Sequence, residues 1–218
     1  MSNDFELLKR SILDQAQTYK ACKRFMGGVD SAKNYAELRT VLYKFWPSFI
    51  MEHRKAVLEF LERDYERFKS CFHIMQIFFN EDTREGRAIY YAKEWPSGCY
   101  VLGRFAEGWA FGQSCVRAVY MAKLIGRDKS VCYYEQRAKG QLFNDCVGRL
   151  YDGSSVSSND NATIYARSSG CSFVSGGNSV VYAKSFRRGK AFGKSIVKGP
   201  SNKNLQLFDE AKYIKMEV

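Results

Sequence analysis

Apolar residues in the first 95 positions recur at intervals of three and four, the spacing that places side chains on one face of a helix. One set spans residues 5–22 and is followed by the glycine pair 27–28, and a second spans residues 31–47 and ends at Pro47. A third spans residues 49–79, with one stripe made of Val57, Leu61, Tyr65, Phe68, Phe72, Met75 and Phe79. The pattern predicts three helices in a small bundle, with the aromatic stripe in its core.

A different pattern begins at Gly98, where small residues recur every eight positions. They are Gly98, Ala106, Ser114, Ala122, Ser130, Ala138, Cys146, Ser154, Ala162 and Gly170, and a one-residue insertion near Gly176-Gly177 shifts the series to Ser179 and Ser195. Around them the chain often reads small-x-apolar-x-small, as in Ala162-Thr163-Ile164-Tyr165-Ala166, with Gly, Asn or Asp between the units. Alternation with period two indicates strands, and the Gly, Asn and Asp residues indicate corners.

Short strands and corners at a fixed period are typical of a solenoid, in which each coil covers its neighbour. The stronger units recur about every sixteen residues, which predicts two octapeptides per coil, and six or seven coils at about 4.8 Å each. Glycine supports the division, because three glycines lie in residues 1–95 and the other fourteen lie after them. We therefore expect an α+β protein with a helical domain at 1–95, a parallel β-solenoid at 96–200 and a C-terminal cap at 201–218.

The repeat of the form Ser-x-Val-x-Ala, between Gly, Asn or Asp corners, resembles the short β-solenoid repeats of many bacterial and phage proteins. The resemblance covers about residues 97–200 and is specific for the fold. Units 105–111 and 186–192 depart from it, because they carry bulky or basic residues at small positions. The resemblance implies little about function, since such coils occur in unrelated proteins.

Cys99 and Cys115 test the length of the coil. They are sixteen residues apart, so a sixteen-residue coil stacks them about 5 Å apart, within reach of a disulfide on mild oxidation. A coil of twenty-four residues would instead place Cys99 over the neighbourhood of Lys123. All seven cysteines are expected to be thiols in the cytosol, since their number is odd and no CxxC pair is present.

The outward positions of the predicted coils are more apolar than a wall facing water requires. They include Cys99, Cys115, Val131, Thr163, Val180 and Ile196, next to Val101, Arg117, Tyr133, Tyr165, Tyr182 and Lys198. Two interpretations stay open: the helical domain covers this wall, or the wall binds a partner or a second copy of the chain.

Charge is uneven along the chain. The total of +11 is made of +2 in residues 1–95 and +9 in the remainder, and no acidic residue occurs from 161 to 208. That stretch holds the candidate site for RNA or a ribonucleoprotein, in which cations bind phosphate and tyrosines stack on bases. The candidates are Tyr165, Arg167, Tyr182, Lys184, Arg187, Arg188, Lys190, Lys194 and Lys198, with Arg187, Arg188, Lys190 and Lys194 foremost. The alternative is a basic surface that serves solubility alone.

Catalytic and metal-binding patterns are missing from the sequence. His53 and His73, the only histidines, are twenty residues apart and about 160° out of phase on one helix, so they share no metal. The histidine that left-handed β-helix acyltransferases use lies in their coils, and these coils contain none. No phosphate-loop or calcium-coil motif is present. We expect no enzyme activity, no catalytic or metal-binding residue and no cofactor, although a site built from corner Asp, Arg and Tyr residues stays open.

Neither a membrane-spanning run nor a basic, apolar leader is seen after Met1, so a cytoplasmic protein is expected. The leading hypothesis is a non-catalytic binding protein that docks on nucleic acid or a nucleoprotein through a basic solenoid face. Its small, basic, two-part character resembles accessory proteins of mobile elements, such as phage-type inhibitors of RNA-guided nucleases (anti-CRISPR proteins). The alternative is a structural or assembly protein that self-associates through the apolar wall. We expect a monomer or small homo-oligomer, with a protein partner also open.

Overall fold

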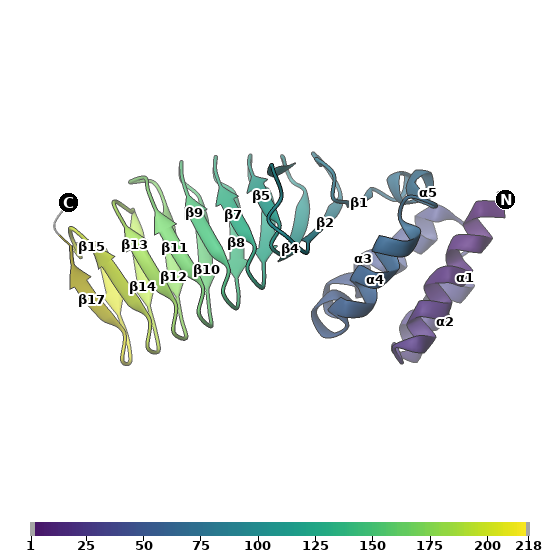
Figure 1. Ribbon diagram of the computed structural model, residues 1–218, viewed down its shortest axis with the longest axis horizontal. Helices are drawn as coiled ribbons and strands as arrows, with labels where there is room; N and C mark the ends of the chain where they lie inside the picture. Colours follow the sequence, from purple (N-terminus) through teal and green to yellow (C-terminus); the bar gives the residue numbers. More distant parts are fainter. Residues whose placement is uncertain (1–2, 217–218) are drawn as a thin grey trace. The chain divides into compact units, whose positions relative to one another are not determined.

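The computed structural model describes residues 3–216, with the side chains at positions 46, 47, 49 and 51 outside the description. The chain forms two compact units, residues 1–79 and residues 80–218 (Figure 1). Five helices and a short strand make up the first unit, and parallel strands arranged as a β-solenoid make up the second. The expected α+β fold, helices followed by a solenoid with about sixteen residues per coil, is confirmed.

The helical unit buries the apolar stripes that its sequence predicts. Its elements are α1 (Asn3–Thr18), α2 (Lys23–Ser31), α3 (Tyr35–Glu52), α4 (Arg54–Asp64), α5 (Lys69–Ile74) and β1 (Ile77–Phe79). On α1 the buried residues are Phe5, Leu8, Ile12 and Ala16, one face of the helix. Among the described helices, none is long and apolar enough to cross a membrane.

Two predicted helix ends, at the glycine pair and at Pro47, were wrong. The glycine pair lies inside α2, where a Cβ on Gly28 would come 3.0 Å from Val41, so glycine there allows α2 to approach α3 closely. Helix α3 continues past residue 47 to Glu52, and Ile50 in this last part is buried, which offsets the hydrogen bond that a proline cannot donate.

The predicted long helix at 49–79 is divided among the end of α3, α4, α5 and β1. Its aromatic stripe is nevertheless buried, with the Tyr65 and Phe72 rings stacked 5.3 Å apart. Gln76 adopts a left-handed backbone (φ 54°) after α5, so the chain leaves the helical path there. The apolar spacing therefore predicted burial correctly but not one continuous helix.

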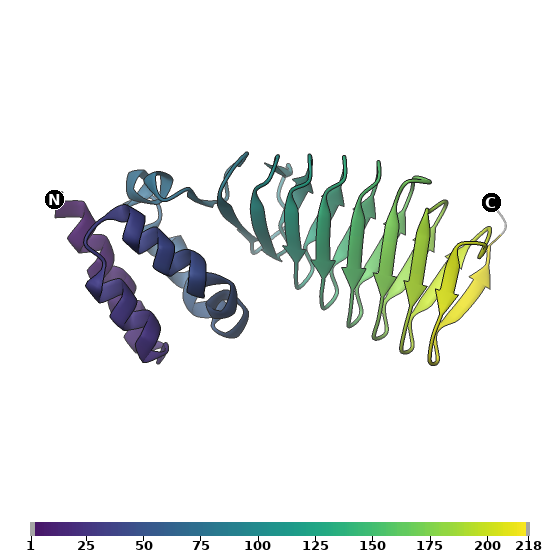
Figure 2. The ribbon, with the colours of Figure 1, turned by 180° about the vertical axis from the view of Figure 1, so that it is seen from behind.

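The solenoid has two parallel sheets that face each other (Figures 1 and 2). Sheet A contains β2 (Arg87–Ala92), β4 (Glu107–Gly112), β6 (Lys123–Gly126), β8 (Lys139–Leu142), β10 (Ser155–Ser158), β12 (Ser172–Ser175), β14 (Arg188–Ala191) and β16 (Leu205–Leu207). Sheet B contains β3 (Tyr100–Leu102), β5 (Cys115–Ala118), β7 (Val131–Tyr134), β9 (Val147–Leu150), β11 (Thr163–Ala166), β13 (Val180–Ala183), β15 (Ile196–Gly199) and β17 (Lys212–Lys215). Successive strands of the chain alternate between the sheets, which gives about eight turns, one or two more than the sequence predicts.

Strand register confirms the sixteen-residue coil. Val131 pairs with Val147 and Val147 with Thr163, each sixteen residues on. Cys99 and Cys115 form a disulfide with their α-carbons 4.6 Å apart, as stacking in successive coils requires. Thr163 pairs with Val180, however, seventeen residues on. The extra residue lies in the turn at 167–171 and not at Gly176-Gly177 as predicted, because Cys171 takes the buried position expected for Gly170.

Small inward residues allow the two sheets to approach. Those from Ala106 to Ala162 in the eight-residue series are fully buried, as predicted. Where one sheet carries a large side chain, the facing position is small: a Cβ on Gly140 would clash with the ring of Tyr134. The Tyr134 hydroxyl donates a hydrogen bond to the Leu124 carbonyl at 3.0 Å, so this buried polar group has a partner.

Each coil turns at a first corner, after its sheet A strand, and at a second corner, after its sheet B strand. The first corner repeats a left-handed residue at Gly112, Asp128, Asn144, Asp160, Gly177, Gly193 and Asp209. Side chains of this column bind the neighbouring coil: Asp128 Oδ2 accepts from the Gly112 N–H at 3.0 Å, and Asp160 Oδ2 from the Asn144 N–H at 3.0 Å. The second corner has left-handed residues only in its early coils, at Arg104, Tyr120, Met121, Gln136, Arg137, Asp152 and Gly153.

Strands β16 and β17 add one further coil within the segment expected to form a cap, since β14 pairs with β16 and β15 with β17. This coil exposes Leu207, Phe208, Ile214 and Met216. Residues 217 and 218 of the expected cap lie outside the described residues.

Candidate functional site

One column of outward side chains runs along sheet B over six successive coils. Each member occupies the third position of its strand, and paired register places it beside the next member. The column contains Arg117, Tyr133, Arg149, Tyr165, Tyr182 and Lys198. Cations and tyrosines therefore stack along the solenoid at the spacing of neighbouring strands.

Contacts within this column order its side chains. The guanidinium of Arg149 lies 5.3 Å from the centre of the Tyr133 ring and donates a hydrogen bond to the Tyr133 hydroxyl at 3.2 Å. The rings of Tyr165 and Tyr182 stack 5.1 Å apart and are inclined by 11°. The Lys198 ammonium lies 5.2 Å from the centre of the Tyr182 ring on the next coil. Cation–π and stacking contacts of this kind hold the side chains in a ladder.

Arg167 and Lys184 lie beside the ladder, each in the position that follows its sheet B strand. The Arg167 N–H bonds to the Leu150 carbonyl and the Lys184 N–H to the Ala166 carbonyl, so the two residues occupy the same corner of successive coils. Both are exposed, and the Arg167 guanidinium lies 5.8 Å from the centre of the Tyr165 ring.

Five of the nine predicted site residues thus gather on sheet B. We call them the tyrosine patch: Tyr165, Arg167, Tyr182, Lys184 and Lys198. Among the described residues, none of its three cations forms an ion pair with a carboxylate. The reason lies in the sequence, since no acidic residue occurs from 161 to 208. The patch is therefore a cluster of uncompensated positive charge.

The other four predicted residues lie elsewhere. Arg188 and Lys190 are on β14 in sheet A, Arg187 precedes that strand, and Lys194 lies in the first corner that follows it. Half a coil is eight residues, so Tyr182 and Lys190 occupy opposite sheets and their side chains point away from each other. The structure divides the predicted set between two faces.

Sequence reasoning missed Arg149 as a member of the ladder. Its strand, Val147-Gly148-Arg149-Leu150, lacks the small-x-apolar-x-small pattern, so the repeat does not predict Arg149 as an outward residue of a strand. The signal was nevertheless present, because Arg149 stands sixteen residues after Tyr133 and sixteen before Tyr165.

A second outward column, at the first position of the sheet B strands, is apolar and half-buried. It contains Val131, Val147, Thr163, Val180 and Ile196. Side chains with branched β-carbons pack well against one another along a sheet. This column, which we call the valine column, confirms the apolar outward positions that the repeat predicts.

Strongly perturbed titratable groups lie in the solenoid core and not on this surface. Burial raises the pKa of Tyr134 and of Cys146 well above their usual values, so both groups are neutral at physiological pH. The Cys146 thiol lies 3.0 Å from the Ser130 hydroxyl in the same buried layer. Within the described part of the chain, no group of three His, Cys, Asp or Glu side chains could hold a metal ion.

The chain matches no protein-family model, no curated protein and no solved structure with which it was compared. The function proposed below therefore rests on the solenoid's own residues.

Proposed function

We propose that the protein acts by binding, without catalysis, and that it binds the phosphate backbone of single-stranded RNA through the tyrosine patch. The observation that carries this proposal is the group of three unpaired cations, Arg167, Lys184 and Lys198, around two ordered tyrosines. Phosphate is the natural counter-charge for such a cluster, because protein cations that neutralise phosphates release the counterions condensed on the nucleic acid. Arginine can also bind a phosphate with two parallel hydrogen bonds.

The tyrosines contribute differently from the base-stacking role that the sequence predicts. Tyr165 and Tyr182 cover one another, and Arg167 and Lys198 lie against them as well. A base could stack on these rings only after the ladder had opened. We therefore infer that the patch offers tyrosine hydroxyls and cations to phosphate and sugar, which gives binding with little sequence preference.

The test uses fluorescence anisotropy with a labelled twenty-nucleotide oligouridine and the full chain. The triple variant Arg167→Glu, Lys184→Glu and Lys198→Glu should weaken binding about 100-fold and reduce the slope of log affinity against log salt by about 2. The matched control is Arg187→Glu, Arg188→Glu and Lys190→Glu, which changes the charge equally on the opposite side of the solenoid and should have a much smaller effect.

Equal losses in the two triple variants would contradict the patch assignment, since they would show a response to net charge alone. A larger loss in the control would move the site to sheet A, which holds Arg188 and Lys190, two of the four foremost candidates from the sequence. Absence of binding by the wild-type chain at low salt would overturn the proposal.

A narrower form of the proposal is that the bound RNA belongs to a nucleoprotein and that the chain inhibits an RNA-guided nuclease. Its support is the same patch, because the guide RNA of such an enzyme presents phosphates along its length. Adding the purified chain to a cleavage reaction should then block cleavage, whereas adding the patch triple variant in its place should leave cleavage intact. Cleavage that is unaffected by the wild-type chain would exclude inhibition of that nuclease.

The valine column supports a second candidate function, self-association. A continuous row of branched, mostly apolar side chains on a sheet can bury itself against a second copy. Sedimentation velocity over a range of protein concentrations tests this candidate. Dimers that resist high salt and are lost in the Val180→Lys, Ile196→Lys variant would favour it, and a monomer at all concentrations would exclude it.

A further inference from the structure

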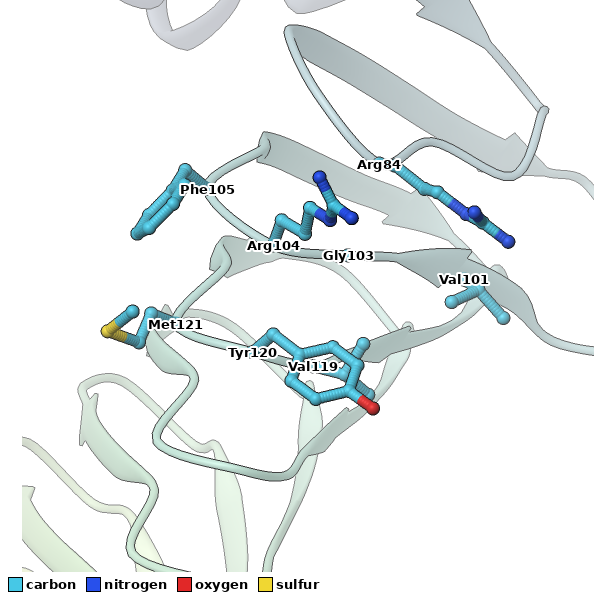
Figure 3. Close-up of a pocket in the computed structure, with 8 residues that line it drawn as sticks. All are labelled: Arg84, Val101, Gly103, Arg104, Phe105, Val119, Tyr120 and Met121. Carbon is cyan, nitrogen blue, oxygen red and sulfur yellow. The ribbon is translucent and has the colours of Figure 1, made fainter.

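A second surface lies on the early coils of the solenoid, away from the tyrosine patch. An open hollow of 660 Å³ is bordered by the loop at Arg84 and two successive second corners. Figure 3 shows Phe105 and Met121 on one side of these corners, Arg84 and Val101 on the other, and Arg104 and Tyr120 between them. We call these six residues the apolar groove.

Large apolar side chains are unusually exposed in this groove. Phe105 is 73% exposed, Tyr120 57% and Met121 46%, and Val101 adds a further exposed side chain. Single exposed apolar residues are ordinary, but a contiguous group around a hollow marks a surface that binds something.

The groove carries large exposed side chains on a left-handed backbone. Arg104, Tyr120 and Met121 have left-handed φ values of 50°, 51° and 66°. The first corner of the same solenoid meets the same requirement with glycine, aspartate and asparagine, which adopt it more readily. The same two positions of the next coil, Gln136 and Arg137, are left-handed too, so the corner itself sets this backbone. The groove differs in placing an exposed tyrosine and an exposed methionine there, and large exposed apolar side chains that cluster on a surface mark a binding site.

Charge indicates what the groove binds. Arg84 and Arg104 both line it and are exposed. Arg104 has Glu85 at 3.8 Å, but both side chains are about two-thirds exposed, so this ion pair is weak and easily exchanged. Arg84 has no carboxylate partner among the residues that the structure describes. Two available guanidinium groups beside an apolar hollow match a ligand that carries carboxylates next to apolar side chains.

We propose that the apolar groove binds a short segment of a partner protein in which an apolar side chain is flanked by Asp or Glu. The apolar side chain enters the hollow between Phe105 and Met121, and the carboxylates pair with Arg84 and Arg104. This surface lies on coils that the tyrosine patch does not use, so the proposal stands independently of RNA binding.

A display library of random twelve-residue peptides, selected against the purified full chain, tests the proposal. Enriched peptides should carry Leu, Ile, Phe or Met within four positions of Asp or Glu. Synthetic peptides from the selection should bind wild type at least about tenfold more tightly than the Phe105→Ser, Met121→Ser variant. The matched control is Val174→Ser, which removes an exposed apolar side chain from sheet A and should leave binding unchanged.

Charge reversal makes the test sharper. The Arg84→Glu, Arg104→Glu variant should lose the acidic peptides and, in a fresh selection, enrich peptides with Lys or Arg in place of the acids. Circular dichroism should show every variant folded, since each changed side chain is exposed. The patch triple variant should bind the selected peptides as wild type does.

Four results would overturn the proposal. Enriched peptides without Asp or Glu would show that the groove does not select this chemistry. Selected peptides that bind the Phe105→Ser, Met121→Ser variant as tightly as wild type would show the same. Loss of oligouridine binding in the Phe105→Ser, Met121→Ser variant would assign the groove to RNA. A concentration-dependent dimer of wild type that this variant abolishes would make a second copy the occupant.

Discussion

The two corners of each coil meet the same backbone demand with different residues. In the first corner the left-handed position is always Gly, Asp or Asn, and aspartate or asparagine side chains bind the adjacent coil. In the early second corners the left-handed positions include Tyr120, Met121 and Arg137. Each left-handed residue of that size costs about 1–2 kcal/mol.

Backbone hydrogen bonds between coils show how the second corner holds this conformation. The Met121 N–H bonds to the Gln136 carbonyl at 3.3 Å, and the Arg137 N–H bonds to the Asp152 carbonyl at 3.1 Å. The stack of coils therefore supports a strained turn that the residues themselves do not favour. The first corner therefore joins coils through its side chains, whereas the early second corners hold large exposed side chains on a left-handed backbone that the neighbouring coil supports.

The largest expected loss of stability comes from adding a methyl group to a glycine of the first corner, and the same change in the second corner is its control. Gly177, in the first corner, and Gly153, in the second, both have a left-handed φ. A Cβ on Gly177 would lie 2.8 Å from the Asp160 backbone nitrogen, whereas the nearest atom to one on Gly153 is a flexible Arg137 carbon at 3.7 Å. Gly177→Ala should lower the free energy of unfolding by about 3 kcal/mol and Gly153→Ala by about 1 kcal/mol. Urea denaturation measures both, and equal losses would contradict the packing difference.

The disulfide lies at the end of the solenoid where the side-chain hydrogen bonds of the first corner begin. Cys99 and Cys115 are joined across sixteen residues, one coil before the contact between Gly112 and Asp128 is made. Reduction should lower the free energy of unfolding by about 3 kcal/mol, because a loop of this length is no longer closed in the unfolded chain. Thermal unfolding with and without reductant measures the change. The Cys99→Ser, Cys115→Ser variant is the control and should not respond to reductant; an unchanged wild-type midpoint would show that the bond adds nothing.

Asp160 separates the two contributions of a first-corner residue. Its backbone is left-handed (φ 57°), and its carboxylate accepts the Asn144 N–H. Asp160→Ala loses the hydrogen bond and gains strain, so unfolding should cost about 2 kcal/mol less, whereas Asp160→Gly loses only the bond, about 1 kcal/mol. Chemical denaturation of the pair measures the difference. Identical losses would mean that backbone strain plays no part in this corner.

The smallest effect has the opposite sign. Tyr120 is exposed and left-handed, so Tyr120→Gly should raise the free energy of unfolding by about 0.5 kcal/mol, the relieved strain less the extra freedom of the unfolded chain. Phe105 is exposed in the same groove without a left-handed backbone, so Phe105→Gly should instead destabilise by about 0.5 kcal/mol. Paired urea titrations measure both. A destabilised Tyr120→Gly variant would show that the second corner is not strained.

Local periodicity was sufficient to predict the solenoid, since each inward small residue recurs at the same place in every coil. It did not predict where the series shifts, because an extra residue in a turn leaves strands on either side unchanged; only pairing of Thr163 with Val180 placed it at 167–171. It also failed at Pro47 and at the long aromatic stripe, where packing of residues such as Ile50 and Phe72 outweighed local helix signals.

The candidate site was predictable only in part. The acid-free stretch and the outward phase of Tyr165 and Tyr182 follow from counting along the chain. The division of the basic residues between two sheets follows only from the strand bounds, because a change of one residue in a corner decides which side chains share a face.

By itself the sequence determined the class of the fold and the small residues that face inward, and it predicted a sixteen-residue coil and the pairing of Cys99 with Cys115, which the strand register and the disulfide confirm. These properties depend on intervals of two, eight and sixteen, which a chain carries in one dimension. The tertiary structure decided which cations join the tyrosines, that the rings of Tyr165 and Tyr182 cover each other, and that Phe105 and Met121 border one hollow. These properties depend on contacts between coils, and the relevant distances exist only after the strands have paired.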